Sequence, residues 1–422
     1  MTVNFEKLLA DFACECGRVH SSEVKKVVMA PGVLPELPSV IAEMGDYKHL
    51  IMICDDNTYA VAGERVEKLL ALDQIIRLNP DHLHANERAV GEVQEKMNAE
   101  VDLFVAVGSG TIHDITRYVA YHRGVPFVSV PTAASVDGYV SNVAAMTWNG
   151  AKKTMTACAP IAMVADIDII AEAPMRLTAS GVGDMLGKYT SLLDWKVGHA
   201  LTGEYYCPHI VSLVEEALAN VRDSIGALQS RDRDAITSLM YGLVLSGVAM
   251  QHTGISRPAS GSEHHISHFI EMTIPAEICD ALHGEKVGVG LMLVSRLYHA
   301  FAALSDEEIA KRLSDYQKAD DDFINEKFGS LAGEIFKENA KDCAEGVTTA
   351  QVLAILPELR AWIAELPKPD ALGAMLDTCG ACKTLKDIDL SEKEMIPALY
   401  AVAPLVRNRL TLMRLLTCFD FA

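Results

Sequence analysis

LFVAVGSGTIHD, residues 103–114, is the stretch of sequence that decides the fold. Its five leading apolar residues, Leu103–Val107, are typical of a strand that is buried on both faces. The bend Gly108-Ser-Gly110 follows, and Thr111–Tyr121 then has the pattern of a helix. A buried strand that passes into a helix through a glycine-rich bend predicts a parallel sheet covered by helices.

The same alternation extends over the first part of the chain. Further strands are predicted at Lys26–Met29, His49–Cys54, Pro126–Val130 and Ile161–Ala165, and further helices at Tyr59–Leu70 and Ala85–Met97. In such a Rossmann-like sheet, ligands bind beyond the carboxyl ends of the strands. Asp55, Gly108–Gly110 and Thr132–Asp137 all fall at such ends.

The pattern changes from Ala173 onward, where helical periodicity continues with few strand signals. Helices are predicted at Leu192–Thr202, His209–Ala227, Ala235–Met250, Val287–Leu304, Ser305–Tyr316, Thr349–Leu366, Pro369–Cys379 and Lys393–Val406. We therefore predict an α/β domain over residues 1–170 and an all-α domain over residues 171–422. The functional site is expected in the cleft between them.

The composition is that of an acidic globular protein. Of 422 residues, 50% are hydrophobic, and 37 basic against 57 acidic residues give a net charge of −20. This excess argues against nucleic-acid binding, which depends on Lys and Arg. A phosphorylated substrate would need local positive charge to overcome the unfavourable overall field.

No targeting or membrane segment is expected. Met1–Phe12 has neither a basic n-region nor a continuous apolar h-region, and no run of about eighteen apolar residues occurs. We therefore expect a cytoplasmic chain whose ten cysteines are reduced thiols. Cys14-x-Cys16 and Cys379-x-x-Cys382 are the close pairs, and such spacings are weak signals of a metal or redox site.

The bend at 108–110 is a candidate dinucleotide site. Glycine lets the backbone approach a pyrophosphate, and the start of a helix supplies free N–H groups and partial positive charge. An ordinary strand-to-helix turn has the same pattern and remains the alternative. Asp55 ends a predicted strand, where a carboxylate can bind ribose hydroxyls and favour NAD over NADP. Asp56 is adjacent, and either carboxylate could instead cap a helix before Thr58.

Three separate segments each contain a potential metal ligand. SGVGD (180–184) ends in Asp184, SGSEH (260–264) ends in His264, and LHGEK (282–286) contains His283. One carboxylate and two imidazoles suit Zn²⁺, Ni²⁺ or Fe²⁺, and three protein ligands leave coordination positions open for catalysis. His268 is expected to share a helix face with His264. The alternatives are a capping role for Asp184 at a helix start and a polar helix surface for the histidines.

Asp137 is a candidate for binding substrate hydroxyls. It follows the turn Pro131–Ser135, and a carboxylate accepts strong charge-assisted hydrogen bonds. An Asx-turn before Gly138 is the alternative. For a phosphate group, the candidates close to the predicted ligands are Arg257, Lys188, Lys286 and the Ser260–Ser262 segment. Each charged candidate could equally form a structural ion pair.

Two further motifs, VPTAASVDG (130–138) and SRPASGSEH (256–264), resemble the iron-containing alcohol dehydrogenase superfamily when taken with the segments above. Within it, the chain is most similar to the glycerol-1-phosphate dehydrogenases of the bacterial type. The resemblance implies the dehydroquinate synthase-like fold and a homodimer or larger homo-oligomer. It also implies reversible, metal-assisted reduction of dihydroxyacetone phosphate to sn-glycerol 1-phosphate by NAD(H), with NADP(H) as an alternative cofactor.

The resemblance further implies roles for single residues. Asp184, His264 and His283 map onto the ligands of a nickel, zinc or iron ion. Asp137, Asp184 and His268 map onto catalytic positions that face the substrate. With Asp55, the implied cofactor contacts are Gly108, Gly110, Thr111, Ile112, His113, Asp114, Thr132, Ala133, Ala134, Ser135 and Ser141.

Two other functions stay open. A glycerol or other polyol dehydrogenase of the same superfamily would not require a phosphate group. A cyclase resembling dehydroquinate synthase would use NAD transiently with a metal. That family usually has Gly-Gly-Lys after its acidic turn residue, whereas Gly-Tyr-Val-Ser follows Asp137 here.

Overall fold

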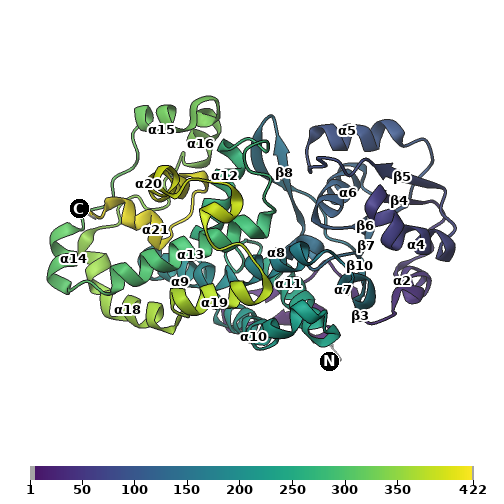
Figure 1. Ribbon diagram of the computed structural model, residues 1–422, viewed down its shortest axis with the longest axis horizontal. Helices are drawn as coiled ribbons and strands as arrows, with labels where there is room; N and C mark the ends of the chain where they lie inside the picture. The colour runs from purple at the N-terminus through teal and green to yellow at the C-terminus, as the bar shows by residue number, and fades with distance from the viewer. Residues whose placement is uncertain (1–4, 421–422) are drawn as a thin grey trace.

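A six-stranded parallel sheet organises the N-terminal part of the computed structural model, which describes residues 5–420 (Figure 1). Its order is β3-β10-β7-β6-β4-β5, and every neighbouring pair is parallel. The strands are β3 (Lys26–Ala30), β4 (Leu50–Asp55), β5 (Gln74–Leu78), β6 (Leu103–Gly108), β7 (Phe127–Pro131) and β10 (Ala162–Asp166). The predicted α/β class is confirmed, although the sequence pattern does not predict β5.

Helices cover both faces of this sheet because successive side chains along a strand point to opposite sides. On one face, Met52 and Val105 pack with α2 (Leu37–Met44) and α4 (Glu64–Leu69). On the other, Ile51 and Phe104 pack with α5 (Glu87–Lys96) and α6 (Gly110–Arg123). The short helix α3 (Asp56–Thr58) and the π-helix η2 (Tyr59–Gly63) lead into α4, while α7 (Ile167–Ala171) follows β10.

The C-terminal region is helical, as predicted. Its α-helices are α8 (Met175–Leu186), α9 (Lys188–Thr202), α10 (Pro208–Ser224), α11 (Arg233–Thr253), α12 (Ser262–Thr273), α13 (His283–Ala302), α14 (Asp306–Arg312), α15 (Asp321–Phe328), α16 (Ala332–Glu338), α17 (Thr349–Ala354), α18 (Leu356–Glu365), α19 (Pro369–Cys379), α20 (Glu392–Val402) and α21 (Leu412–Leu415). The predicted helix Thr349–Leu366 is broken at Ile355. Pro357, in the first turn of α18, lacks the N–H that a continuous helix would need.

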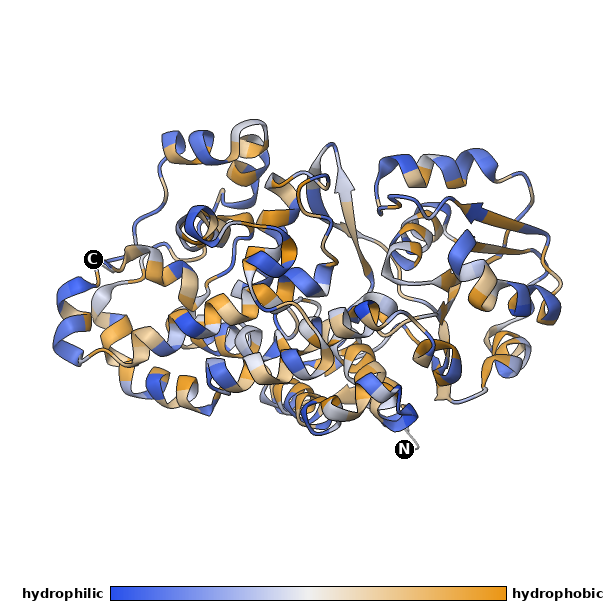
Figure 2. Cartoon of the chain, in the orientation of Figure 1, coloured by the Kyte–Doolittle hydropathy of each residue, from blue (hydrophilic) through white to orange (hydrophobic). Residues whose placement is uncertain are grey.

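The sheet and the helical region share a continuous core. Met163 and Ala165 of β10 lie in the same hydrophobic cluster as Val182 of α8 and Leu243 of α11, and Ile170 and Ala171 also belong to it. Figure 2 shows hydrophobic residues gathered on the inward faces of the elements in both parts. Because this cluster continues through residues 170–171, the division there stays a prediction.

Two antiparallel hairpins form separate two-stranded sheets. One pairs β8 (Val143–Trp148) with β9 (Ala151–Thr156) and lies between the sheet and the helical region (Figure 1). The other pairs β1 (Phe12–Ala13) with β2 (Val19–His20) near the N-terminus. Residues 1–4 of the Met1–Phe12 segment lie outside the described residues.

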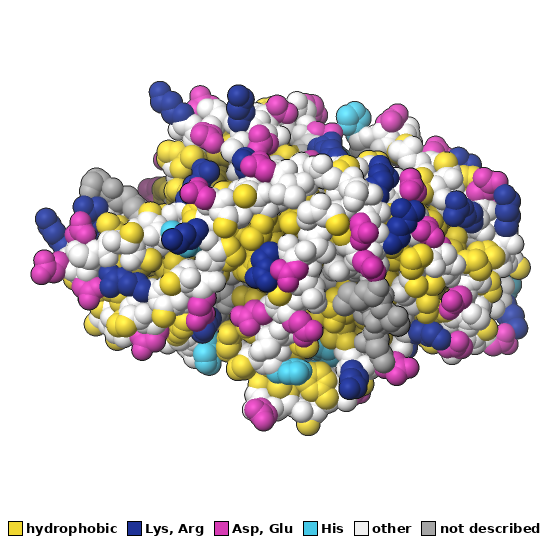
Figure 3. Space-filling model, turned by 60° about the horizontal axis from the view of Figure 1, so that its bottom comes forward, with side chains coloured by type: hydrophobic (Ala, Val, Ile, Leu, Met, Phe, Trp, Pro, Cys, Tyr) yellow, Lys and Arg dark blue, Asp and Glu magenta, His cyan; other side chains and the backbone are white. Residues whose placement is uncertain are grey.

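Two properties of the described residues bear on possible partners. No single helix among them is long and apolar enough to cross a membrane, although α13 and α14, bent by 111° at their junction, pass that test together by length and composition. On the face in Figure 3, basic and acidic side chains are interspersed rather than gathered into one basic surface. That face therefore offers no continuous cationic track for a nucleic acid.

Candidate active site

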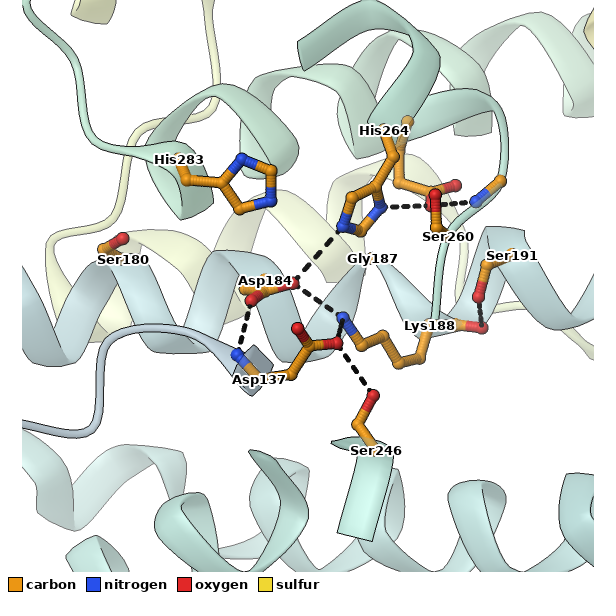
Figure 4. A network of polar contacts seen from close by, with 12 residues as sticks. Asp137, Ser180, Asp184, Gly187, Lys188, Ser191, Ser246, Ser260, His264 and His283 are labelled. Carbon is orange, nitrogen blue, oxygen red and sulfur yellow. Dashed lines mark hydrogen bonds and ion pairs between the residues drawn. The ribbon is translucent and has the colours of Figure 1, made fainter. Parts of the chain in front are cut away.

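Asp184, His264 and His283 come together from three helices (Figure 4). Asp184 lies near the end of α8, His264 in the first turn of α12, and His283 is the first residue of α13. One potential ligand atom from each residue lies within 4.8 Å of the other two, and His264 Nε2 is 3.5 Å from Asp184 Oδ1. The structure thus gathers all three predicted metal ligands at one place.

The expected start of a helix at Asp184 is wrong, because α8 begins at Met175. The glycines before Asp184 lie inside that helix and allow close packing. A Cβ atom on Gly181 would lie 2.0 Å from the Ala134 carbonyl oxygen, and one on Gly183 would lie 2.2 Å from the Gly284 carbonyl oxygen. The motif SGVGD therefore brings α8 against both the β7 loop and α13.

Each of the two imidazoles is held by a carboxylate behind it. His264 Nδ1 donates to Glu263 Oε1 at 2.7 Å, and His283 Nδ1 donates to Glu271 Oε1 at 3.0 Å. Donation from Nδ1 leaves Nε2 as the ring atom that can bind a cation in the neutral imidazole. This carboxylate–histidine arrangement is typical of metal sites. The donor set therefore fits one divalent cation with open positions.

The fully buried Lys188 links the fully buried Asp184 to the partly exposed Asp137. Its Nζ lies 2.6 Å from Asp184 Oδ1 and 2.8 Å from Asp137 Oδ2, while the Asp137 backbone N–H donates to Asp184 Oδ2 at 2.9 Å. Ser246 also donates to Asp137 Oδ2. Burial raises the pKa of Asp184, but Lys188 and the two histidines outweigh it and hold that pKa well below its usual range. Asp184 is therefore ionised, as a metal ligand must be.

His268 lies beside this cluster. Its ring centroid is 6.0 Å from that of His264 and 5.9 Å from that of His283, so the predicted shared helix face is observed. Burial, with a contribution from Arg407, lowers the pKa of His268 well below its usual value and keeps the ring neutral. Its buried Nδ1 has no hydrogen-bond partner among residues 5–420. A neutral ring with an unpaired nitrogen can exchange a proton with a bound ligand.

The predicted cofactor residues line the carboxyl ends of β6 and β7. Gly108 ends β6, Gly110 begins α6, and Thr132, Ala133, Ala134, Ser135 and Ser141 follow β7 with 6% or less of their surface exposed. A Cβ atom on Gly110 would lie 2.8 Å from Val136 Cγ2. The glycine bend at 108–110 thus packs tightly against the loop that follows β7.

Two of the predicted cofactor residues in α6 cannot offer their side chains to a ligand. Ile112 and His113 are fully buried. The His113 ring bonds to the Ser109 carbonyl oxygen at 2.9 Å and to Ser129 Oγ at 2.7 Å, and burial lowers its pKa to about 3. Any contact from His113 would come from its backbone. Thr111 and Asp114 are partly exposed at the same end of α6.

Asp55 and Asp56 point to different partners. Asp55 Oδ1 accepts from the Thr58 backbone N–H at 2.7 Å, and the Thr58 hydroxyl oxygen accepts from the Asp55 backbone N–H at 3.0 Å, which forms a capping box. Asp56 instead pairs with Arg77 at 2.6 Å. Asp55 therefore caps a helix, which is the alternative role named for it above. The capping bond uses Oδ1 and leaves the other carboxylate oxygen, Oδ2, outside it.

The predicted phosphate anchors have other partners. Arg257 pairs with both carboxylate oxygens of Glu204 and donates to the Leu410 carbonyl oxygen, while Lys188 is neutralised as described. Lys286 Nζ lies 3.9 Å from Glu271. These contacts are those of structural ion pairs, so Arg257 is a poor anchor.

Sequence reasoning misses a basic pocket that is connected to His283 through Lys152 and Glu271. It has a volume of about 350 Å³, and Lys152, Lys153, Arg407 and Arg409 line it together with Glu334 and Glu338. Lys152 Nζ is 3.8 Å from Glu271 Oε2, and Glu271 holds His283. Among the described residues, neither arginine forms an ion pair with a carboxylate. Burial, with contributions from Arg257 and Arg407, lowers the pKa of Arg409 to about 9.

Comparisons with known proteins show the family of the chain. The family model for iron-containing alcohol dehydrogenase matches residues 28–174. A glycerol-1-phosphate dehydrogenase [NAD(P)+] of Bacillus licheniformis is 40% identical over 323 residues, which span 73% of this chain and 80% of that protein. The enzyme of the same name from Geobacillus stearothermophilus is 31% identical over 95% of this chain and 94% of its own.

Solved structures show the same fold at lower identity. A putative alcohol dehydrogenase from Ralstonia eutropha superposes with a TM-score of 0.61 at 18% identity, covering 94% of this chain and 96% of that one. A probable glycerol dehydrogenase from Sinorhizobium meliloti gives 0.54 at 18% identity, covering 85% of this chain and 98% of that one.

Proposed function

Because the chain belongs to the glycerol-1-phosphate dehydrogenases of the iron-containing alcohol dehydrogenase family, oxidoreductases that act on CH–OH groups, we propose that it interconverts dihydroxyacetone phosphate and sn-glycerol 1-phosphate. NAD(H) supplies or accepts the hydride, and NADP(H) is the alternative cofactor. The observation that supports this substrate is the basic pocket that is connected to His283 through Lys152 and Glu271. A plain polyol has no charge that such a pocket would bind.

Asp184, His264 and His283 would hold one divalent cation, which we propose to be nickel or zinc, with iron as the alternative. When bound, such an ion supplies Lewis acidity toward a carbonyl or hydroxyl oxygen. The remaining tasks fall to side chains. Glu263 and Glu271 fix the two imidazoles, and Lys188 fixes Asp184 relative to Asp137.

Asp137 and His268 are the proposed substrate-facing residues. Asp137 Oδ2 is used by Lys188 and Ser246, which leaves Oδ1 to accept a substrate hydroxyl. His268, whose neutral ring lies beside those of His264 and His283, would hold or release the hydroxyl proton. Lys188 is thus a positioning residue rather than a phosphate anchor.

The cofactor is proposed to lie over the first turn of α6. The N–H groups of Gly110 and Thr111 lie in the first turn of this helix, where they have no intrahelical partner, and the helix start attracts a pyrophosphate. Thr132–Ser135 and Ser141 would border the nicotinamide half. The second oxygen of Asp55 would bind the adenosine ribose and disfavour a 2′-phosphate.

The phosphate group is proposed to bind between Lys152 of β9 and Arg407 and Arg409 of the C-terminal segment. Arg407 already reaches β9, because its guanidinium donates to Thr154 Oγ1 at 3.0 Å. Arginine binds phosphate through paired N–H groups, and each charge-assisted bond contributes about 1.5–3 kcal/mol. These cations provide the local positive field that a chain of net charge −20 needs.

The test is the ratio of kcat/KM for dihydroxyacetone phosphate over that for dihydroxyacetone. We expect a large ratio in the wild type and a fall of at least about tenfold in Arg407→Ala, equivalent to about 1.4 kcal/mol. Arg222→Ala, on the exposed surface of α10, is the matched control and should leave the ratio unchanged. A wild-type ratio near one would favour the polyol dehydrogenase alternative.

We also propose that the chain is cytoplasmic and forms a homodimer or larger homo-oligomer. Light scattering of the purified chain would test the second statement, and a monomer at micromolar concentration would contradict it.

A further inference from the structure

Three cysteines and a histidine meet at the N-terminal hairpin, on residues that the proposed reaction does not use. Cys14 and Cys16 lie in the turn between β1 and β2, and His20 ends β2. Cys207, far along the chain, immediately precedes α10. One potential ligand atom from each lies within 4.8 Å of the other three. The Cys14-x-Cys16 pair, a weak signal by itself, therefore has two further partners in space.

The spacing of these atoms matches a tetrahedral zinc site. With Zn–S near 2.3 Å and Zn–N near 2.05 Å, a tetrahedron places two sulfurs about 3.8 Å apart and a sulfur and a nitrogen about 3.6 Å apart. The observed separations are 3.6 Å from Cys14 Sγ to Cys207 Sγ, 3.4 Å from Cys16 Sγ to His20 Nε2, and 3.5 Å from Cys207 Sγ to His20 Nε2. Each lies within about 0.2 Å of the tetrahedral value.

The histidine is oriented as a metal ligand would be. His20 is fully buried, and its Nδ1 donates to the His252 carbonyl oxygen at 2.6 Å. This bond fixes the tautomer, so that the unprotonated Nε2 faces the three sulfurs. A backbone carbonyl in this role is a common partner of metal-binding histidines.

The sulfur of Cys16 also has a polar neighbour from a distant part of the chain. The Tyr205 hydroxyl lies 3.4 Å from Cys16 Sγ, and the Arg18 guanidinium stacks 3.4 Å from the centre of the Tyr205 ring. Thiolates are the cysteine form that binds metals.

We propose that Cys14, Cys16, His20 and Cys207 bind one zinc ion in a structural site separate from the Asp184–His264–His283 cluster. Four protein ligands close the coordination sphere, so the site holds no open position for a substrate. The ion would tie the β1–β2 hairpin to the start of α10, and His20 ties it to the end of α11 through His252. This inference does not depend on the proposed reaction.

The test uses the full chain, freed of metal under reducing conditions and titrated with cobalt(II). Thiolate ligands give cobalt an intense charge-transfer absorption in the near ultraviolet, whereas a site of one carboxylate and two imidazoles does not. We expect this band in the wild type, saturating at one cobalt per chain and abolished by one equivalent of zinc. Elemental analysis of the protein as purified should find at least one zinc per chain, and this zinc should remain in His264→Ala.

Variants separate this site from the proposed catalytic one. Cys207→Ser should lose the band and one equivalent of metal, and its fold should survive because serine is a favourable N-cap for α10. His264→Ala should keep the band, and Cys382→Ser, from the other close pair, is the matched control that should keep it too. Absence of the band in reduced wild-type protein would overturn the proposal, as would iron or copper in place of zinc. A Cys14–Cys207 disulfide found by mass spectrometry in metal-free protein as purified would also overturn it.

Discussion

Replacing Gly183 with alanine tests how closely α8 and α13 must approach for the three ligands to meet. A Cβ atom at this position would lie 2.2 Å from the Gly284 carbonyl oxygen, whereas ordinary contact begins at 3.4 Å. The backbones must therefore separate by about 1.2 Å, which is 3.4 minus 2.2. Gly183 precedes Asp184 and Gly284 follows His283, so this movement pulls two of the proposed ligands apart.

The expected cost follows from the same contact. Overpacking a tight interface costs about 1–3 kcal/mol, and removing a glycine from a helix returns about 0.5–1 kcal/mol. Metal affinity should fall further, because ligand distances tolerate only about 0.2 Å of error. We expect Gly183→Ala to bind zinc or nickel at least about tenfold more weakly at the Asp184 site.

Gly91→Ala is the matched control. Gly91 lies in α5, and a Cβ atom there would meet nothing within 4 Å. The urea unfolding midpoint of the Gly91→Ala protein should therefore be equal to or higher than that of the wild type. Calorimetric metal titration and urea unfolding of both variants provide the measurements. If Gly183→Ala matched Gly91→Ala in both, the claim that glycine packing positions the ligands would be wrong.

Three other predictions concern the site and the sheet. Asp184→Asn, His264→Ala and His283→Ala should each lower turnover by more than about 100-fold with an unchanged circular dichroism spectrum, and full retention of metal at that site by all three would refute the ligand assignment. The wild type should prefer NADH over NADPH in kcat/KM. Asp55→Asn keeps an N-cap acceptor but removes the charge, so this preference should shrink in the variant. A wild-type kcat/KM with NADPH equal to or better than that with NADH would contradict the ribose role of Asp55. The pKa of His113 is about 3 in the folded chain and near 6.5 when unfolded, so the unfolded state binds more protons between these values. The contribution of His113 to the free energy of unfolding is therefore present above pH 6.5, and about 2 kcal/mol of it is lost from pH 6.5 to 5. Denaturation of His113→Asn should show a smaller loss over the same pH range. An equal loss in both proteins would count against this role of His113.

The sheet was largely predictable because its central strands are continuous apolar runs. Leu103–Val107 and the other predicted strands all appear, whereas β5 lies at an edge and its short apolar run is interrupted by the polar residues Gln74 and Arg77. The β8–β9 hairpin had a usable signal. Asn149 and Gly150 both adopt positive φ in its two-residue turn, as Asn-Gly pairs between alternating strands commonly do.

The site was predictable only where local motifs contain the ligands. The glycines of SGVGD indicated a helix start, but they serve a contact with Gly284 that sequence spacing cannot show. Arg257 was favoured by its closeness in sequence to His264, yet Glu204 neutralises it. Arg407 and Arg409 lie near the C-terminus, and only the fold brings them to Lys152. Cys207 likewise joins Cys14 and Cys16 only in three dimensions.

The central claim is tested most directly by the product formed from dihydroxyacetone phosphate and NADH on the metal-reconstituted chain. The product is isolated and offered, with NAD⁺, to a dehydrogenase specific for sn-glycerol 3-phosphate. We predict rapid reduction of the phosphorylated ketone to a product that this second enzyme does not oxidise, which identifies sn-glycerol 1-phosphate. Complete oxidation of the product, or reduction of dihydroxyacetone but not of its phosphate, would contradict the account.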